Sequence, residues 1–346
     1  MTSPDLAGNA DLHRPLALIL REVLLTRQAA MTIVAILLFA YFSAEANNFM
    51  SVGNMLDILR ASAFIGIVAV AWTFLLITGE LDLSVGSAYG LGTILMAWFV
   101  TSAGLDPWYA AGLTLIYGAV IGLVNGVVTV YIGVRAFVVT LGMLSLLRGV
   151  SAAISGNFPI SYPRDLASSL FPLGGGTLLG VPAPAAWFLG VAIIGGVILR
   201  RTIFGYWVYA TGGNEGAARQ MGIPTKRIRL TCFVLVGISC GLIAVLQGAW
   251  LRSATPTTGV GFELQVIGAV LIGGAALTGG SGSIYGTLVG ALILGMVANG
   301  LVLMGHPPST GMLASGAIII IAGIIDVALR RLGSRISPLR QGQPDA

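Results

Sequence analysis

Long apolar runs with very few charged residues restrict what this chain can fold into. Only 9% of its 346 residues are charged, whereas a soluble domain carries roughly 25%. A run of about 20 apolar residues crosses the hydrocarbon core of a bilayer. The sequence therefore predicts an all-α polytopic membrane protein of about ten spans. The candidate spans are 28–44, 54–79, 85–103, 108–132, 137–155, 185–203, 230–251, 264–280, 283–305 and 312–329.

The distribution of basic residues predicts the orientation of these spans. With the N-terminus in the cytoplasm, the inner segments hold 14 of the 18 Lys and Arg residues, the outer segments hold 3, and Arg148 falls within a span. Cytoplasmic loops carry such an excess of basic residues. Both termini are therefore expected in the cytoplasm, with the chain crossing the membrane many times. The net positive charge of the chain is explained by its membrane topology. We therefore expect contact with membrane lipid and no binding of nucleic acid.

The same pattern gives a domain organisation with no soluble domain. A cytoplasmic tail over 1–27 precedes a single transmembrane domain over 28–332, and a cytoplasmic tail follows over 333–346. The tail at the start lacks the small-residue exit of a cleaved signal peptide, so we expect a signal-anchor start. Two connections are long: 156–184, rich in proline and glycine, is expected outside, and 204–229 inside. The glycine-rich segment 264–280 is either a short span or a broken, re-entrant element.

The inner loop contains a short predicted helix. Asn214 is a suitable N-cap and Glu215 suits the positive end of a helix, while Gly222 and Pro224 form a stop signal. An exposed helix between such breakers has the shape of a docking element, although an ordinary amphipathic surface helix also fits. Ala217, Ala218 and Met221 are expected to form its apolar outward face. The residues assigned to docking are Gly213, Asn214, Glu215, Ala217, Ala218, Arg219, Met221, Gly222 and Ile223.

A second group of candidate residues is polar and lies close to membrane depth. Glu80, Asp82 and Ser84 join two apolar spans, where ionisable groups usually face a cavity or a partner. They line a solute path, or Asp82 caps the next helix in a cytoplasmic turn. Arg148 lies near mid-bilayer and needs a carboxylate or carbonyl partner, for which Glu80 and Asp82 are candidates. Asn125 and Asn299 are buried polar groups for which interhelical hydrogen bonds are expected.

Catalysis by this chain is not expected. A phosphate-binding loop needs the pattern G-x-x-x-x-G-K-[ST], and the single lysine, Lys226, does not stand in it. His13 and His306 lie in a tail and an outer loop. Cys232 and Cys240, eight positions apart on one helix, are about 12 Å apart along its axis, too far for a disulfide. No metal site or bound cofactor is predicted.

Four ordered motifs resemble the ribose-type permease subunits of bacterial ABC sugar importers, a binding-protein-dependent monosaccharide transport family. The segment 77–87 is similar to that family's T-G-G-I-D-L-S-V-G-S signature, and 137–149 to its F-[IV]-x-T-L-G-x-x-x-x-x-R-G stretch. Residues 213–223 resemble its coupling loop. The segment 256–282 resembles P-x-x-G-x-G-[FY]-E-L followed by G-G-x-G, and its Glu263 joins the candidate path residues.

The resemblance implies an assembly that composition alone does not. It implies a second permease subunit, identical or different, two cytoplasmic ATPase subunits that carry ATP and Mg, and a periplasmic sugar-binding protein. Glu80 and Gln265 depart from the family pattern, which leaves the solute open. An ion-coupled secondary transporter or facilitator without an ATPase is the alternative, since such folds have broken helices and ion sites near the bilayer midplane.

Overall fold

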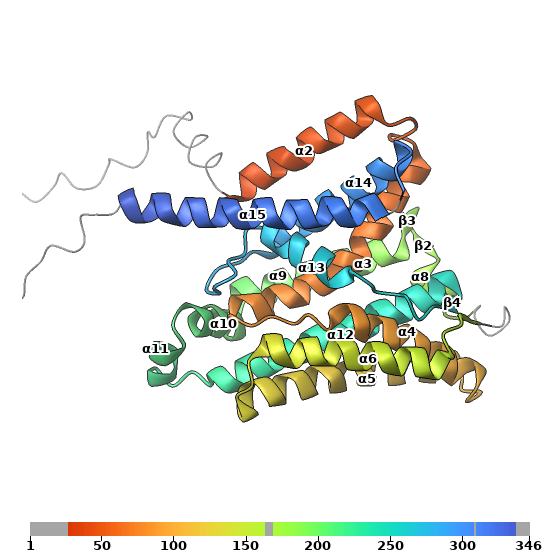
Figure 1. Ribbon diagram of the computed structural model, residues 1–346, viewed down its shortest axis with the longest axis horizontal. Helices are drawn as coiled ribbons and strands as arrows, with labels where there is room; N and C mark the ends of the chain where they lie inside the picture. Colours follow the sequence, from red (N-terminus) through yellow and green to blue (C-terminus); the bar gives the residue numbers. More distant parts are fainter. Residues whose placement is uncertain (1–26, 163–168, 308, 337–346) are drawn as a thin grey trace, which may run out of the picture.

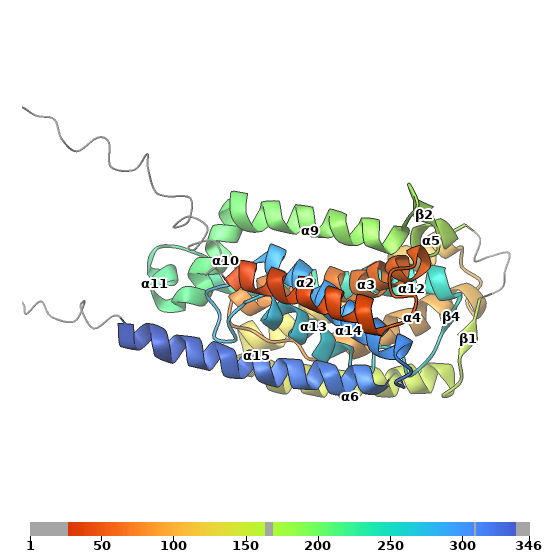
Figure 2. The same cartoon turned by 90° about the horizontal axis from the view of Figure 1, so that it is seen from above.

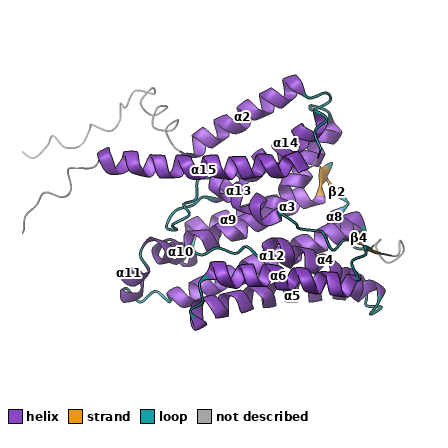
Figure 3. Ribbon diagram, viewed as in Figure 1, coloured by secondary structure: helices purple, strands orange, loops and turns teal. Residues whose placement is uncertain are grey.

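The computed structural model describes residues 27–162, 169–307 and 309–336, which form a bundle of helices with short strands at one end (Figures 1 and 3). The predicted N-terminal tail up to residue 26, with His13, and the last ten residues of the predicted C-terminal tail lie outside the described residues. The helices are α2 (Arg27–Glu45), α3 (Val52–Ile77), α4 (Val85–Thr101), α5 (Pro107–Val127), the π-helix η1 (Val128–Ile132), α6 (Ala136–Ser155), α8 (Phe171–Gly174), α9 (Ala183–Arg201), α10 (Ile203–Gly213), α11 (Glu215–Gln220), α12 (Thr225–Leu251), α13 (Phe262–Ile272), α14 (Ile284–Leu303) and α15 (Ser309–Ile336).

The predicted apolar segments each contain a helix. Within the described residues, six helices are long and apolar enough to cross a membrane: α3, α5 continued by η1, α6, α9, α12 and α14. Four shorter apolar stretches accompany them, at Ala29–Glu45, Val85–Thr101, Phe262–Ile272 and Ser309–Ile321. The chain is therefore mostly helical and has the apolar helices of a polytopic membrane protein.

The segment 264–280 is not one continuous helix. The helix α13 has 11 residues, which at 1.5 Å per residue gives a length of about 16 Å. The hydrocarbon core is about 30 Å thick, so α13 alone is too short to cross it. A non-helical loop follows as far as α14. Of the two possibilities that the sequence left open, the geometry therefore favours the broken element over a complete span.

The two long connections lie at opposite ends of the bundle (Figures 1 and 2). The segment 156–184 and the start of the α12–α13 connection form small antiparallel pairs at one end. There β1 (Ile160–Ser161) pairs with β4 (Ser253–Ala254), and β2 (Thr177–Leu178) pairs with β3 (Val181–Pro182). The helices α10 and α11 lie at the other end, toward which the start of α2 and the end of α15 also point (Figure 1).

Close contact between helix backbones holds α5 against α12. A Cβ atom added at Gly118 would lie 2.3 Å from the carbonyl oxygen of Gly237, and one added at Gly237 would lie 2.1 Å from the carbonyl oxygen of Gly118. Both distances are far below van der Waals contact, so only glycine fits at either position. Small residues permit such close approach in membrane helices, where packing rather than hydrophobic burial drives association.

Two helices begin inside the bundle, next to one another. The helix α4 follows the buried residue Ser84, and α13 begins at the buried Phe262. The rings of Tyr89 and Phe262 have centroids 5.2 Å apart. A Cβ atom added at Gly86 would lie 2.3 Å from Glu263 Oε2. The chain enters both helices through non-helical segments, 78–84 and 255–261, so the interior contains two helix starts with irregular backbone around them. We call this place the helix-start junction.

Candidate functional site

The helix α11 forms where its capping residues predict it. Asn214 Oδ1 accepts a hydrogen bond from the Ala217 backbone N–H at 3.0 Å, as an N-cap does. At the other end Gly222 has a φ of +79°, and the Ile223 N–H donates to the Ala218 carbonyl at 3.0 Å. This is the Schellman arrangement that ends helices at glycine. The predicted two-turn helix is confirmed, with observed bounds Glu215–Gln220.

The outward face of α11 differs from the predicted one at Ala218. Ala218 is only 5% exposed, because it faces the rest of the chain. Met221 is 82% exposed, and Gly213, Gly216 and Ala217 are also exposed. Placing Ala218 on the outward apolar face was therefore wrong, because α11 packs with the Ala218 side of the helix against the chain. The surface offered to a partner centres on Ala217 and Met221.

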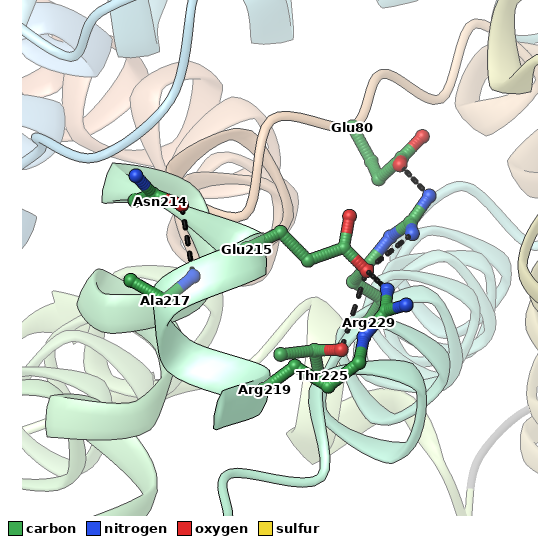
Figure 4. A network of polar contacts seen from close by, with 7 residues as sticks. All are labelled: Glu80, Asn214, Glu215, Ala217, Arg219, Thr225 and Arg229. Carbon is green, nitrogen blue, oxygen red and sulfur yellow. Dashed lines mark hydrogen bonds and ion pairs between the residues drawn. The ribbon is translucent and has the colours of Figure 1, made fainter. Parts of the chain in front are cut away.

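Arg229, near the start of α12, joins two carboxylates from distant parts of the chain (Figure 4). Its Nη2 donates to Glu80 Oε1, and its Nη1 donates to Glu215 Oε1 at 3.4 Å. Glu215 Oε1 also accepts from Arg219 Nη2 at 2.6 Å and from Thr225 Oγ1 at 3.2 Å. The side chains of Arg229 and Glu80 are 17% and 12% exposed. Their ion pair is thus largely withdrawn from water, unlike the exposed Arg219–Glu215 pair.

The two carboxylates of this network have opposite pKa shifts. Burial raises the pKa of Glu80 above its usual value, against the lowering effect of the Arg229 guanidinium. The pKa of Glu215 is lowered: burial opposes this, but the hydrogen bond from Arg219 and the charge of Arg229 outweigh it. A pocket of about 490 Å³ adjoins Glu80 and Arg229, with walls from the α3–α4 loop, η1 and the start of α6. The network therefore has open volume on one side.

Asp82 lies at the entrance to α4 and is 2% exposed. Its Oδ1 accepts from the Ser84 N–H at 2.8 Å and from Ser84 Oγ at 2.6 Å. Asn125 Nδ2 donates to Asp82 Oδ2 at 3.2 Å and to Ser84 Oγ at 2.9 Å, while Trp72 Nε1 donates to the Asp82 carbonyl at 2.9 Å. Asp82 is not the N-cap of α4, which is Ser84. It fixes the non-helical segment to α3 and α5, and Asn125 makes the interhelical contact expected of it.

Arg148 is paired, but with a carbonyl rather than a carboxylate. Its Nη1 donates to the Thr258 carbonyl oxygen at 3.0 Å. The candidate partners Glu80 and Asp82 are engaged by Arg229 and by Ser84 with Asn125, as described above. The suggested pairing of Arg148 with either carboxylate is therefore wrong, because its face of α6 meets the 255–261 segment instead.

At the helix-start junction, Glu263 and Arg148 lie beside successive turns of α4. A Cβ atom added at Gly86 would meet Glu263 Oε2, and one added at Gly90, one turn later in α4, would lie 2.4 Å from the Thr258 carbonyl and 3.9 Å from Arg148 Nη1. Glu263 Oε2 is buried without a hydrogen-bond partner among the residues that the structure describes. The same is true of Asn299 Oδ1 in α14, so its expected interhelical bond through this atom is not present.

Two residues of these networks carry only weak signals in the sequence. In the sequence Arg229 is one of several basic residues of an inner loop, and its place on a helix after a breaker is the only sign of a partner. Thr258 contributes its backbone carbonyl, and no side-chain pattern reveals such a role. Of the other predicted residues, one set lies on or beside α11, and Asp82, Ser84, Asn125, Arg148 and Glu263 lie at or beside the helix-start junction, whereas Asn299 lies apart from both, near the end of α14.

Comparison with known proteins gives one family and several close relatives. Residues 54–323 match the family described as branched-chain amino acid transport system / permease component. The ribose import permease protein of Escherichia coli (strain K12) is 37% identical over 296 residues, 85% of this chain and 92% of that protein. The L-arabinose ABC transporter permease protein of Azospirillum brasilense is 35% identical over 302 residues, 87% and 88% of the two chains. The ribose import permease protein of Bacillus subtilis (strain 168) is 37% identical over 274 residues, 79% and 84%.

Proposed function

The chain belongs to the branched-chain amino acid transport system / permease component family, and from that membership we propose that it is the transmembrane permease subunit of an ATP-driven importer. One subunit supplies half of the translocation path, and a second permease subunit supplies the other half. The permease domain extends over 28–332, with both tails and the loop 204–229 in the cytoplasm and 156–184 outside. The residues Arg148, Glu263, Asp82, Ser84, Asn125 and Asn299 are assigned to the path or its support.

We infer a sugar rather than an amino acid as the solute. The family description names amino acids, but the three relatives compared above are named for ribose or L-arabinose. The polar groups at the helix-start junction suit a hydroxylated solute, because an arginine and a carboxylate can donate to and accept from hydroxyl groups. A periplasmic sugar-binding protein would deliver the solute.

The proposed coupling role rests on one observation, the form and position of the helix α11. It is a short capped helix at the end of the bundle opposite the strands, with Met221 82% exposed. A helix of 6 residues is not stable alone. A partner protein that covers the exposed Met221 would stabilise it. ATP and Mg bind to cytoplasmic ATPase subunits, whose closure would displace α11 and give alternating access.

A substitution at Met221 tests this proposal. Met221→Arg puts a bulky charge on the outward face, and a positive charge at the C-terminal end of a helix interacts favourably with its dipole, so α11 itself should stay folded. The full chain, affinity-tagged in its native host, should retain its membrane level but lose the copurifying ATPase and the uptake of radiolabelled ribose and L-arabinose. Leu178→Arg, at an exposed position on β2 at the other end, is the matched control and should leave ATPase copurification unchanged.

The non-helical segments that precede α4 and α13 inside the bundle also fit one alternative. Ion-coupled secondary transporters also have broken helices near the bilayer midplane. Uptake that persists after ATP depletion but stops with a protonophore or without sodium would support that alternative. Full uptake by Met221→Arg with its ATPase still bound would likewise contradict docking through α11.

A further inference from the structure

The Arg229 bridge connects the proposed docking helix to the interior of the bundle. We propose that Arg229 acts as a positioning residue that couples α11, through Glu80, to the start of α4 at the helix-start junction. This inference rests on the proposed function, because it describes how a displacement of α11 by an ATPase would reach the solute path. It adds a specific side-chain link that docking alone does not require.

The first step joins α11 to Arg229. Glu215 is the first residue of α11, and its Oε1 receives bonds from Arg229 and from Thr225, both on α12. The carboxylate therefore fixes the start of α11 to the first turns of α12. A movement of α11 changes the position of a charge that Arg229 contacts directly.

The second step crosses from α12 to the α3–α4 loop. Arg229 and Glu80 are 149 residues apart in the sequence, and their charged groups meet where both side chains are largely buried. A charge pair withdrawn from water is screened less than a surface pair. One guanidinium presents separate N–H groups to two carboxylates, a bridge that the single ammonium group of lysine cannot reproduce in the same geometry.

The third step leads from Glu80 to the path. Only the non-helical residues 81–84 separate Glu80 from α4, and Asp82 within them is fixed to Ser84 and Asn125. The first turn of α4 then contacts the start of α13 through Gly86 and Glu263. The pocket of about 490 Å³ beside Glu80 gives this segment room to shift. A displacement at Glu80 can therefore change how α4 and α13 meet.

A second connection joins α10 to the end of α3, and an experiment must distinguish it from the route through Arg229. The Gly280 N–H donates to the Ile77 carbonyl at 2.8 Å, and Gly212 at the end of α10 packs against the same carbonyl. This route uses backbone atoms and does not involve Arg229. A substitution that removes only the side-chain charges distinguishes the two routes.

The test uses the full chain copurified with its ATPase and reconstituted in proteoliposomes, with Thr257→Cys as a reporter. Thr257 is exposed on the segment that covers α4, whereas Cys232 and Cys240 are buried. Maleimide labelling is measured with and without ATP and vanadate. Glu80→Gln and Arg229→Gln should each reduce the nucleotide-dependent change in labelling about fivefold or more, the lower end of typical coupling between sites. ATPase copurification should stay unchanged.

Two further variants complete the design. The double variant, Glu80→Gln with Arg229→Gln, removes both charges of the pair and leaves neither unpaired, so it should assemble even if a single variant does not. Its nucleotide-dependent change in labelling should be no smaller than that of either single variant. Asp57→Asn breaks the Arg60 ion pair near the other end of α3 and should leave the response intact. A full nucleotide response in the double variant would overturn the inference. Failure of the Thr257→Cys parent to copurify an ATPase would instead reject the proposed function.

Discussion

At the residue scale, Arg148 stabilises the helix-start junction through one hydrogen bond to a backbone carbonyl. Arg148→Leu would leave the Thr258 carbonyl without this donor. A buried acceptor that loses its partner costs about 1–3 kcal/mol, and because this bond is only partly buried the cost should lie toward the lower end of that range. We expect a corresponding fall in the unfolding free energy of the purified permease, measured by thermal unfolding, together with reduced uptake. Arg148→Lys, which keeps a donor, should lose less, and unchanged stability and uptake in Arg148→Leu would contradict the assignment.

Glu80 and Glu215 should respond to pH with opposite signs. Glu215 has a lowered pKa, so its stabilising contribution is present above the unfolded pKa and is lost as the pH falls through the folded pKa. Glu80 has a raised pKa, so the folded state favours its protonated form, and stability from this group is lost as the pH rises through the folded pKa. Because Glu215 is partly exposed, its pairs are expected to contribute no more than about 1 kcal/mol.

Melting temperatures between mildly acidic and neutral pH check these signs. At neutral pH, Glu215→Gln should melt below the parent, and the difference should shrink on acidification. Glu80→Gln should melt close to the parent at neutral pH, because removal of a carboxylate that burial disfavours offsets the lost ion pair, and Arg229 keeps Glu215 as a partner. A large neutral-pH destabilisation by Glu80→Gln would mean that the carboxylate mainly holds the fold together, rather than positioning α4.

At the element scale, the contact between α5 and α12 depends on glycine at two facing positions. Gly237→Ala would place a methyl group 2.1 Å from the Gly118 carbonyl oxygen. Overpacking of this kind costs typically about 1–3 kcal/mol, although alanine is otherwise the better helix former. Thermal unfolding should show Gly237→Ala to be destabilised.

Gly112→Ala is the matched substitution in the same pair of helices. A Cβ atom at Gly112 of α5 would meet nothing within 4 Å, so the variant should be neutral or gain up to about 1 kcal/mol from helix propensity. Equal effects of the two alanines would show that α5 and α12 do not pack as closely as their backbones indicate.

At the scale of the whole molecule, the two ends of the bundle are predicted to lie on opposite sides of the membrane. Ala217 in α11 and Leu178 in β2 are both exposed, at opposite ends, and the two native cysteines are buried. An impermeant maleimide added to intact cells should label Leu178→Cys but not Ala217→Cys. Permeabilised cells, in which both should be labelled, provide the control, and labelling of Ala217→Cys alone from outside would reverse the topology.

The sequence by itself determined the elements whose causes are local. Apolar runs separated by charged loops located the long helices, because each span must satisfy its own backbone hydrogen bonds in lipid. Asn214 and Gly222 defined α11 because a cap and its helix turn are only a few residues apart. The order of four motifs identified the family. These features depend on neighbours along the chain.

Only the tertiary structure decided which distant groups meet. Arg148 and Thr258 are 110 residues apart, and Arg229 and Glu80 are 149 apart. An arginine near several carboxylates and carbonyls takes the partner that helix packing brings to it. The rotation of each helix about its axis decides this, and no local sequence pattern encodes that rotation. The same packing buried Ala218 and left Met221 exposed on one short helix, and it brought the starts of α4 and α13 together. The elements therefore follow from hydrophobicity and capping, whereas the site follows from the fit between helices.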